Sequence, residues 1–208
     1  MLDKYTITLL ALMAHILVAN CHDSFVYNLI EIVRSTSGCS YEVYPIEQCR
    51  GVCLDRFDAL LLSPGPGHPT EMDGLSELIE HTYRCMPIMG VCLGLQALAC
   101  FFGGSLRQLS RPLHGHADRL RLANAEEVWF KAFPIESCIG RYHSWVVDEQ
   151  SFPKELQVIA YAESDGTIMA LRHKALPIYA VQFHPESYLS PYGSELVRYW
   201  LRSVHSRI

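Results

Sequence analysis

The sequence predicts an α/β protein with a mostly parallel central sheet flanked by helices and a smaller antiparallel flap. Three observations support this prediction. The first half alternates short apolar runs with helix-like segments, which is typical of βαβ units. The apolar runs are nearly continuous, as in strands that are buried on both faces. Beyond about residue 105, short strand-like runs follow one another with turn signals between them.

The first half of the chain supplies the predicted parallel strands and their helices. Asp23 can cap the first helix, and Gly103 and Gly104 can close the last one. The strands are expected at 15–20, 42–44, 58–63 and 88–91, and the helices at 23–32, 74–84 and 94–102.

The second half supplies the predicted flap and a closing helix. Strand-like runs are expected at 106–122, 128–130, 156–162, 167–172 and 178–183. A final helix is expected at about 190–202, with Leu196, Val197, Trp200 and Leu201 turned inward.

The N-terminus allows more than one interpretation. The apolar run 6–19 resembles the core of a signal segment, and a secreted lipoprotein beginning at Cys21 is one alternative. This run has 14 residues and contains His15, so it is too short to span a bilayer. We predict an N-terminal extension at 1–14, with Met13 as a possible original start, followed by one domain at 15–208 and no membrane association.

Composition limits the partners and the cellular compartment. The chain has 208 residues, is 50% hydrophobic and carries a net charge of -5, which suits one globular domain. No basic stripe is present, so nucleic-acid binding is not expected. The eight cysteines include no Cys-x-x-Cys pair, so neither a zinc ribbon nor a thioredoxin-type motif is supported, and we predict no metal and no cofactor. An even number of cysteines could form disulfides, but a chain of this length and apolar content does not need them, so we expect reduced thiols in the cytoplasm.

One cysteine differs from the others in its surroundings. Gly90-Val91-Cys92-Leu93-Gly94 lies between a predicted strand and a predicted helix, and it matches the Gly-x-nucleophile-x-Gly pattern of a nucleophile elbow. The two glycines remove the Cβ atoms that would collide in such a tight turn. The helix N-terminus would favour the thiolate of Cys92. The alternative is a buried structural cysteine.

A base for this cysteine is available in "AVQFHPES". His184 and Glu186 follow a predicted strand and stand two residues apart, so their side chains can lie on one side of an extended chain. The carboxylate could then orient the imidazole. A surface histidine in a turn is the alternative.

The stretch "LLSPGPGHPTE" predicts a rigid loop after a buried strand. Because proline has no N–H group, Gly65 and Gly67 are the available donors, and one of them could hold a tetrahedral oxygen. An ordinary surface turn is the alternative.

Six motifs together resemble the class I, triad-type glutamine amidotransferases, and among these the glutaminase subunits of anthranilate synthase and aminodeoxychorismate synthase. The motifs occur in the family's order and cover about residues 16–199; they are "HDSFVYNL", "LLSPGPGHP", "GVCLGLQALACFFGG", "RYHSWVV", "DGTIMALRH" and "AVQFHPES". The resemblance implies a flavodoxin-like fold.

The resemblance also implies residue roles. Cys92 would be the nucleophile that forms a γ-glutamyl thioester, His184 the acid and base, and Glu186 its orienting carboxylate. The backbone N–H groups of Leu93 and Gly65 would form the oxyanion hole. The remaining residues of the glutamine site would be Pro66, Gly67, Gln96, Ser144 and Trp145.

The resemblance further implies a partner: a separate synthase that aminates chorismate with the released ammonia. It leaves open whether the product is anthranilate, aminodeoxychorismate or another chorismate derivative. Two alternatives remain, a γ-glutamyl hydrolase or peptidase of the same fold and a non-catalytic partner-binding module. The chain departs from the family at Leu95, where histidine is usual, and at Trp145, where leucine is common.

Overall fold

The computed structural model describes residues 13–124, 127–131, 133–134 and 136–206, and every structural statement below concerns these residues. The predicted extension at 1–14 lies almost wholly outside them, so that boundary stays a prediction. The strands are β1 Ala14–Asn20, β2 Cys39–Pro45, β3 Ala59–Leu62, β4 Ile88–Val91, β5 Leu106–Gln108, β6 His116–Leu122, β7 Cys138–Arg141, β8 Trp145–Val147, β9 Leu156–Ala162, β10 Ile168–His173 and β11 Ile178–Val181. The α-helices are α2 Val26–Arg34, α3 Leu75–Thr82, α4 Leu93–Phe101 and α5 Gly193–His205. Short 3₁₀ helices cover η1 Ile46–Gly51, η2 Leu54–Arg56, η3 Pro69–Glu71, η4 Val128–Phe130 and η5 Glu149–Ser151.

One mixed sheet forms the centre of the molecule, in the order β2-β1-β3-β4-β11-β10-β9-β6-β7. The first five strands in this order pair in parallel, and the others pair antiparallel. A separate small sheet joins β5 and β8. The predicted α/β class is therefore confirmed, and the predicted antiparallel part continues the central sheet through β10, β9, β6 and β7, beside the small sheet of β5 and β8.

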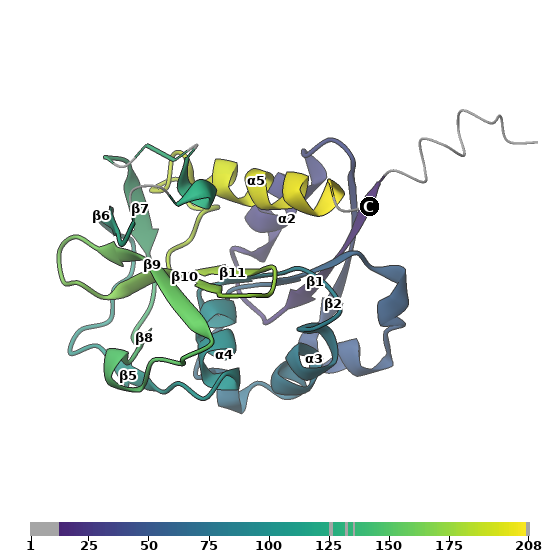
Figure 1. Ribbon diagram of the computed structural model, residues 1–208, viewed down its shortest axis with the longest axis horizontal. Coiled ribbons are helices and arrows are strands. Elements are labelled where there is room, and N and C mark those ends of the chain that lie inside the picture. Colours follow the sequence, from purple (N-terminus) through teal and green to yellow (C-terminus); the bar gives the residue numbers. More distant parts are fainter. Residues whose placement is uncertain (1–12, 125–126, 132, 135, 207–208) are drawn as a thin grey trace, which may run out of the picture.

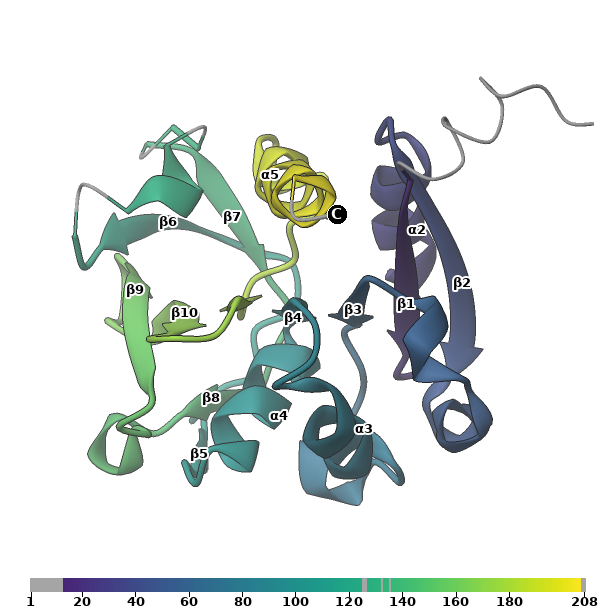
Figure 2. The ribbon, with the colours of Figure 1, turned by 45° about the vertical axis from the view of Figure 1, so that its right-hand side comes forward.

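Helices cover both faces of the parallel half. Figure 1 shows α2 and α5 on one side of the sheet and α3 and α4 on the other. Along β1, Ile16 and Val18 face the α2/α5 core, whereas Leu17 and Ala19 face the α3/α4 core. Side chains alternate across a strand, so a strand that is apolar at every position must be covered on both faces. The turned view of Figure 2 shows the antiparallel strands curving away from the parallel half.

Several predicted elements need correction. The apolar triplet 128–130 is the 3₁₀ helix η4, not a strand, and the run 106–122 divides into β5 and β6. The first helix begins at Val26 because Asp23 is used one turn earlier, where its Oδ1 accepts the backbone N–H of Phe25 at 2.7 Å. The last helix runs three residues further than expected and ends at His205.

The parallel strands bring their carboxyl ends to one edge of the sheet. The chain passes from β1 outward to β2 and then returns to β3 on the other side of β1, so the order of strands reverses there. Ligands of open α/β sheets bind outside the carboxyl ends of the strands near such a reversal. The segments after β1, β3, β4 and β11 are therefore the ones that can build a site together.

Candidate active site

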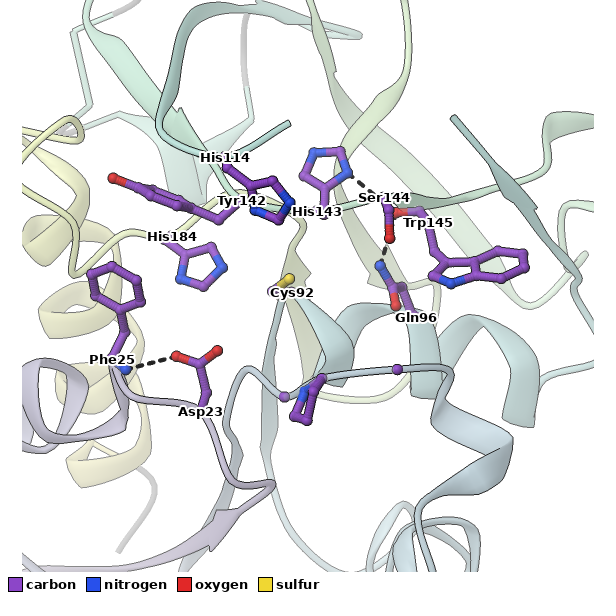
Figure 3. Close-up of a pocket in the computed structure, with 13 residues that line it drawn as sticks. Asp23, Phe25, Cys92, Gln96, His114, Tyr142, His143, Ser144, Trp145 and His184 are labelled. Carbon is purple, nitrogen blue, oxygen red and sulfur yellow. Dashed lines mark hydrogen bonds between the residues drawn. The ribbon is translucent and has the colours of Figure 1, made fainter. Parts of the chain in front are cut away.

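These four segments line one pocket of about 360 Å³, a size at the small end of ligand pockets. Figure 3 shows its side chains converging from several elements. The pocket contains most of the residues predicted from the sequence: Gly65, Pro66, Gly67, Cys92, Gln96, Ser144, Trp145 and His184. Its other lining residues are Asp23, Phe25, His114, Tyr142 and His143. Leu93 and Glu186 lie directly behind this lining.

Cys92 occupies a strained turn between β4 and α4. Its φ of 53° and ψ of -100° lie outside the ordinary regions for a residue with a side chain. A Cβ atom on Gly90 would lie 2.6 Å from the backbone of Gly94, and one on Gly94 would lie 2.7 Å from the carbonyl oxygen of Leu62. Only glycine at both places permits this turn, which places the sulfur at the N-terminus of α4 and inside the pocket.

His184 reaches the same pocket from the segment after β11. Its Nδ1 lies 2.8 Å from Oε1 of Glu186, and both side chains are almost fully buried. The backbone at His184 is fixed, because its N–H donates to Gly140 O at 2.9 Å and its carbonyl accepts the Ser190 hydroxyl at 2.6 Å. The other ring nitrogen, Nε2, is buried without a hydrogen-bond partner among the described residues, and the ring lies beside the Cys92 sulfur in Figure 3.

The charges around His184 favour its protonated form. Burial alone would lower its pKa, but the charge of the neighbouring Cys92 sulfur, together with the Glu186 carboxylate, outweighs burial and raises the pKa well above its usual 6.5. Two aromatic rings, Phe25 and Tyr142, flank the imidazole with centroids at 5.5 and 5.1 Å in T-shaped arrangements. These contacts hold the ring in one orientation. The arrangement suits a thiolate and imidazolium pair.

The loop after β3 forms the opposite wall of the pocket. Gly65 packs so closely that a Cβ there would lie 2.5 Å from both Leu93 Cδ2 and Cys21 O. The Ser63 hydroxyl accepts the backbone N–H of Cys21 at 2.8 Å and ties the loop to the end of β1. Further along, His68 caps η3 through its contact with Thr70. The predicted rigid loop is therefore present, and it places Gly65 beside the first turn of α4.

A third wall comes from the segment around β8. Trp145 contributes its carbonyl oxygen, which accepts Nε2 of Gln96 at 2.9 Å and Nδ1 of His143 at 3.2 Å. Its indole meets the His68 ring edge to face at 5.1 Å. Ser144 and Trp145 therefore stand opposite the β3 loop in the same pocket, with Gln96 between.

His143 lies beside this wall but is held neutral. A backbone carbonyl can only accept, so Nδ1 carries the proton, and Nε2 accepts from Arg141 Nε at 3.2 Å. Burial and the charge of Arg141 lower the pKa of His143 to about 3. His143 therefore cannot serve as a second base.

Arg141 belongs to a buried ionic cluster behind the site. Its guanidinium donates to Asp118 Oδ2 at 2.7 Å and to Asp165 Oδ2 at 2.9 Å, and it is itself fully buried. Although burial opposes their charges, hydrogen bonds from Ser164 and Arg141 lower the pKa of Asp118, and bonds from Arg141 and Thr167 lower that of Asp165 to about 2. This cluster fixes the β7 end from which His143, Ser144 and Trp145 follow.

The other cysteines have different surroundings. All eight cysteines are free thiols. Cys21 lies near the pocket, but burial raises its pKa to about 12, which keeps it a neutral thiol. Cys92 is the cysteine that lines the pocket and faces a histidine.

Sequence reasoning missed several residues of the site. Asp23, Phe25, His114, Tyr142 and His143 line the pocket, and Gln182 bonds to two of its residues. Gln182 had a detectable signal, because a single polar residue inside the predicted apolar run 178–183 must find a hydrogen-bond partner. The others come from loops whose side-chain directions no periodicity reveals.

Comparison with known proteins adds independent information. The sequence model of the family described as Glutamine amidotransferase class-I matches residues 17–204. A Haemophilus influenzae protein named anthranilate synthase component 2 is 42% identical over 191 residues, covering 89% of this chain and 95% of that protein. An Azospirillum brasilense protein named anthranilate synthase is 39% identical over 176 residues, covering 84% of this chain and 24% of that longer protein.

Among solved structures, a candidate GMP synthase subunit from Thermoplasma acidophilum matches with a TM-score of 0.79 and 25% identity, over 94% of this chain and 95% of that chain. Within the described residues, the helices are all too short or too polar to cross a membrane.

Proposed function

The chain belongs to the class-I glutamine amidotransferases, and from this membership we propose that it is the glutaminase component of an anthranilate synthase. It hydrolyses glutamine to glutamate and passes the ammonia to a separate synthase that aminates chorismate. The observation that carries the proposal is the pairing of Cys92, on its strained turn, with the buried His184–Glu186 pair in one pocket.

The proposed reaction has two halves. The Cys92 thiolate attacks the side-chain amide carbon of glutamine, and the backbone N–H groups of Leu93 and Gly65 hold the resulting oxyanion. The His184 imidazolium gives its proton to the amide nitrogen, so that ammonia leaves and a γ-glutamyl thioester remains. His184, now neutral, takes a proton from water, which cleaves the thioester and restores the thiolate. Glutamine and water give glutamate and ammonia.

The rest of the pocket supports the binding of a free amino acid. Pro66, Gly67, Ser144 and Trp145 form two facing walls, and Gln96 stands between them. The feature that favours free glutamine over the peptide substrates of a γ-glutamyl peptidase is Gln96 together with the "RYHS" segment that carries Ser144, and both lie in this pocket.

Glu186→Gln tests whether the Glu186 carboxylate stabilises the protonated form of His184. The amide keeps the shape but removes the negative charge that helps to raise the pKa of His184, so this pKa falls. The imidazolium then persists only to lower pH, and we expect the basic limb of the kcat profile to move to lower pH. We expect kcat to fall by about 10²–10⁴-fold. The measurement is glutamine hydrolysis from pH 5 to 10.

The matched control is Glu195→Gln, which removes a carboxylate from the exposed side of α5. It should leave the pH profile unchanged. An unchanged basic limb in Glu186→Gln would contradict the role given to that carboxylate.

The assignment to the anthranilate branch comes from the relatives. The Haemophilus influenzae relative, which this chain matches over 95% of its length, is named anthranilate synthase component 2. In the Azospirillum brasilense relative the matching region is about a quarter of a protein named anthranilate synthase, so the rest of that enzyme accompanies it in one chain. The aminodeoxychorismate branch is the alternative that the partner experiment below decides.

The reduced thiols favour action in the cytoplasm.

The surface beside the pocket suits a partner protein. Tyr27 on α2 and Tyr188 and Tyr192 before α5 are large exposed side chains, with Tyr188 84% exposed. Both segments adjoin the site, because Phe25 and His184 are in ring contact. A synthase seated here would cover the mouth of the pocket and could receive ammonia before water protonates it.

The partner is tested by measuring glutaminase activity of the purified chain alone and with candidate chorismate-utilising synthases. We expect low activity alone and a rise of about tenfold or more with the cognate anthranilate-forming synthase. Stimulation by an aminodeoxychorismate-forming synthase alone would reassign the branch. Full activity of the isolated chain, unchanged by any synthase, would contradict the ammonia-delivery proposal.

A further inference from the structure

We propose that Gln182 donates a hydrogen bond to the Cys92 sulfur and sets the direction of the Gln96 side chain. Gln182 directly follows β11 and is fully buried, two residues before His184. Its backbone N–H donates to Met169 O at 2.8 Å, which fixes its position in the sheet. The effect of Gln182 on turnover rests on the proposed function, whereas its contact with the sulfur does not.

The direction of each amide follows from one backbone carbonyl. The end of the Gln96 side chain that lies 2.9 Å from Trp145 O must be the nitrogen, because a carbonyl oxygen can only accept. That nitrogen also lies 3.1 Å from the Gln182 side chain, so the Gln182 end facing it must be the oxygen. The opposite end of Gln182 is therefore the Nε2 group.

This Nε2 group lies 3.5 Å from Cys92 Sγ. An N–H group directed at sulfur stabilises the thiolate more than the neutral thiol, since hydrogen bonds to charged acceptors are the stronger ones. Because Gln182 is 0% exposed, its amide must find its hydrogen-bond partners among protein groups such as this sulfur. Unlike His184, the amide is neutral, so it stabilises the nucleophile at every pH without competing for a proton.

The hydrogen bond between Gln96 and Gln182 also affects the part of the pocket where the substrate would bind. Gln96 uses its N–H groups on Trp145 O and Gln182 Oε1, which leaves its own Oε1 as the end that can accept from a ligand. Figure 3 shows this oxygen turned away from Trp145. Such an acceptor suits the ammonium group of a free amino acid. Without Gln182 the Gln96 amide would lose one of the two contacts that set this direction.

The test uses Gln182→Met, which fills similar space but offers no donor or acceptor. Gln157→Met, at a half-buried position on β9 outside the pocket, is the matched control. Iodoacetamide alkylation of Cys92 is followed from pH 5 to 10 by mass spectrometry of its peptide. The variant leaves intact the other titratable groups of the pocket, which are Asp23, His114, Tyr142, His143 and His184.

We expect the pH midpoint of Cys92 alkylation to rise by about one unit in Gln182→Met, which corresponds to the loss of one hydrogen bond to a charged group, about 1.4 kcal/mol. The control should not move it. We also expect KM for glutamine to rise by about fivefold or more, as the Gln96 direction is lost. Thermal unfolding confirms that each variant is folded, and Gln182→Leu repeats the measurement if the methionine variant is not.

An alkylation midpoint unchanged in the folded variant would overturn the contact with sulfur. A shifted midpoint with unchanged KM would overturn the role assigned to Gln96. If the wild-type chain hydrolyses no glutamine with any synthase, the proposed function fails, but the alkylation profile still decides whether Gln182 acts on Cys92.

Discussion

Replacing Cys92 by alanine is expected to reduce glutamine hydrolysis by about 10⁴-fold or more, because it removes the sulfur that would form the thioester beside His184. His143 is neutral and bonded on both ring nitrogens. The measurement is glutamate release by the chain with its activating synthase, so that a low basal rate does not hide the loss.

Cys100→Ala is the control for this experiment. Cys100 lies on the same helix, α4, and is half-buried, but it does not line the pocket. It should retain activity. Synthase activity with added ammonium salts should persist with Cys92→Ala, since external ammonia bypasses the glutaminase step. Glutamate release near the wild-type rate in Cys92→Ala would contradict the nucleophile assignment.

The second large effect is expected on stability. Arg141→Met leaves the carboxylates of Asp118 and Asp165 and Nε2 of His143 without their buried donor. Removing one partner of a buried ionic cluster costs about 3–5 kcal/mol of unfolding free energy, which for a chain of this size lowers Tm by roughly 6–20 °C. Calorimetry or circular dichroism at pH 7 measures this loss.

The stability that this cluster contributes is expected to depend on pH. The pKa of Asp165 is depressed to about 2, so its contribution to stability is complete above the pKa of an unfolded aspartate and is lost as pH falls toward 2. The gap in Tm between wild type and Arg141→Met should therefore narrow as the pH falls from about 4 toward 2.

Arg121→Met, which removes an exposed arginine stacked on Tyr161 at 4.8 Å, should cost about 1 kcal/mol or less. A loss in Arg141→Met no larger than in this control would show that the cluster is not a stability determinant.

The fold class could be predicted because the parallel strands are local apolar runs. The strands at 88–91 and 156–162 agree with the structure residue for residue, since each is bounded by clear turn signals. The continuity of the antiparallel strands with the main sheet could not be predicted. It depends on β11 pairing with β4 on one edge and β10 on the other, and pairing between distant segments leaves no periodic signal. The triplet 128–130 is too short for periodicity to distinguish a strand from a 3₁₀ turn.

Some features of the candidate site could likewise be predicted from the sequence, and others could not. Gly90 and Gly94 predicted the turn at Cys92 because the steric demand of the turn is local. The contacts among Gln96, Trp145 and Gln182 could not be derived, because they join segments up to 86 residues apart through side-chain directions. Arg141 appeared only as part of a motif, and its buried charge cluster became evident from the geometry.

The most direct test of the central claim is covalent labelling by a glutamine analogue that carries a diazoketone in place of the side-chain amide. Attack by the Cys92 sulfur would form a thioether as nitrogen gas leaves and His184 supplies the proton. Peptide mass spectrometry should find the adduct on Cys92 alone, blocked by excess glutamine and greatly slowed in His184→Ala. Labelling of another residue at an equal rate, or labelling of Cys92 that is indifferent to both glutamine and His184, would contradict the account.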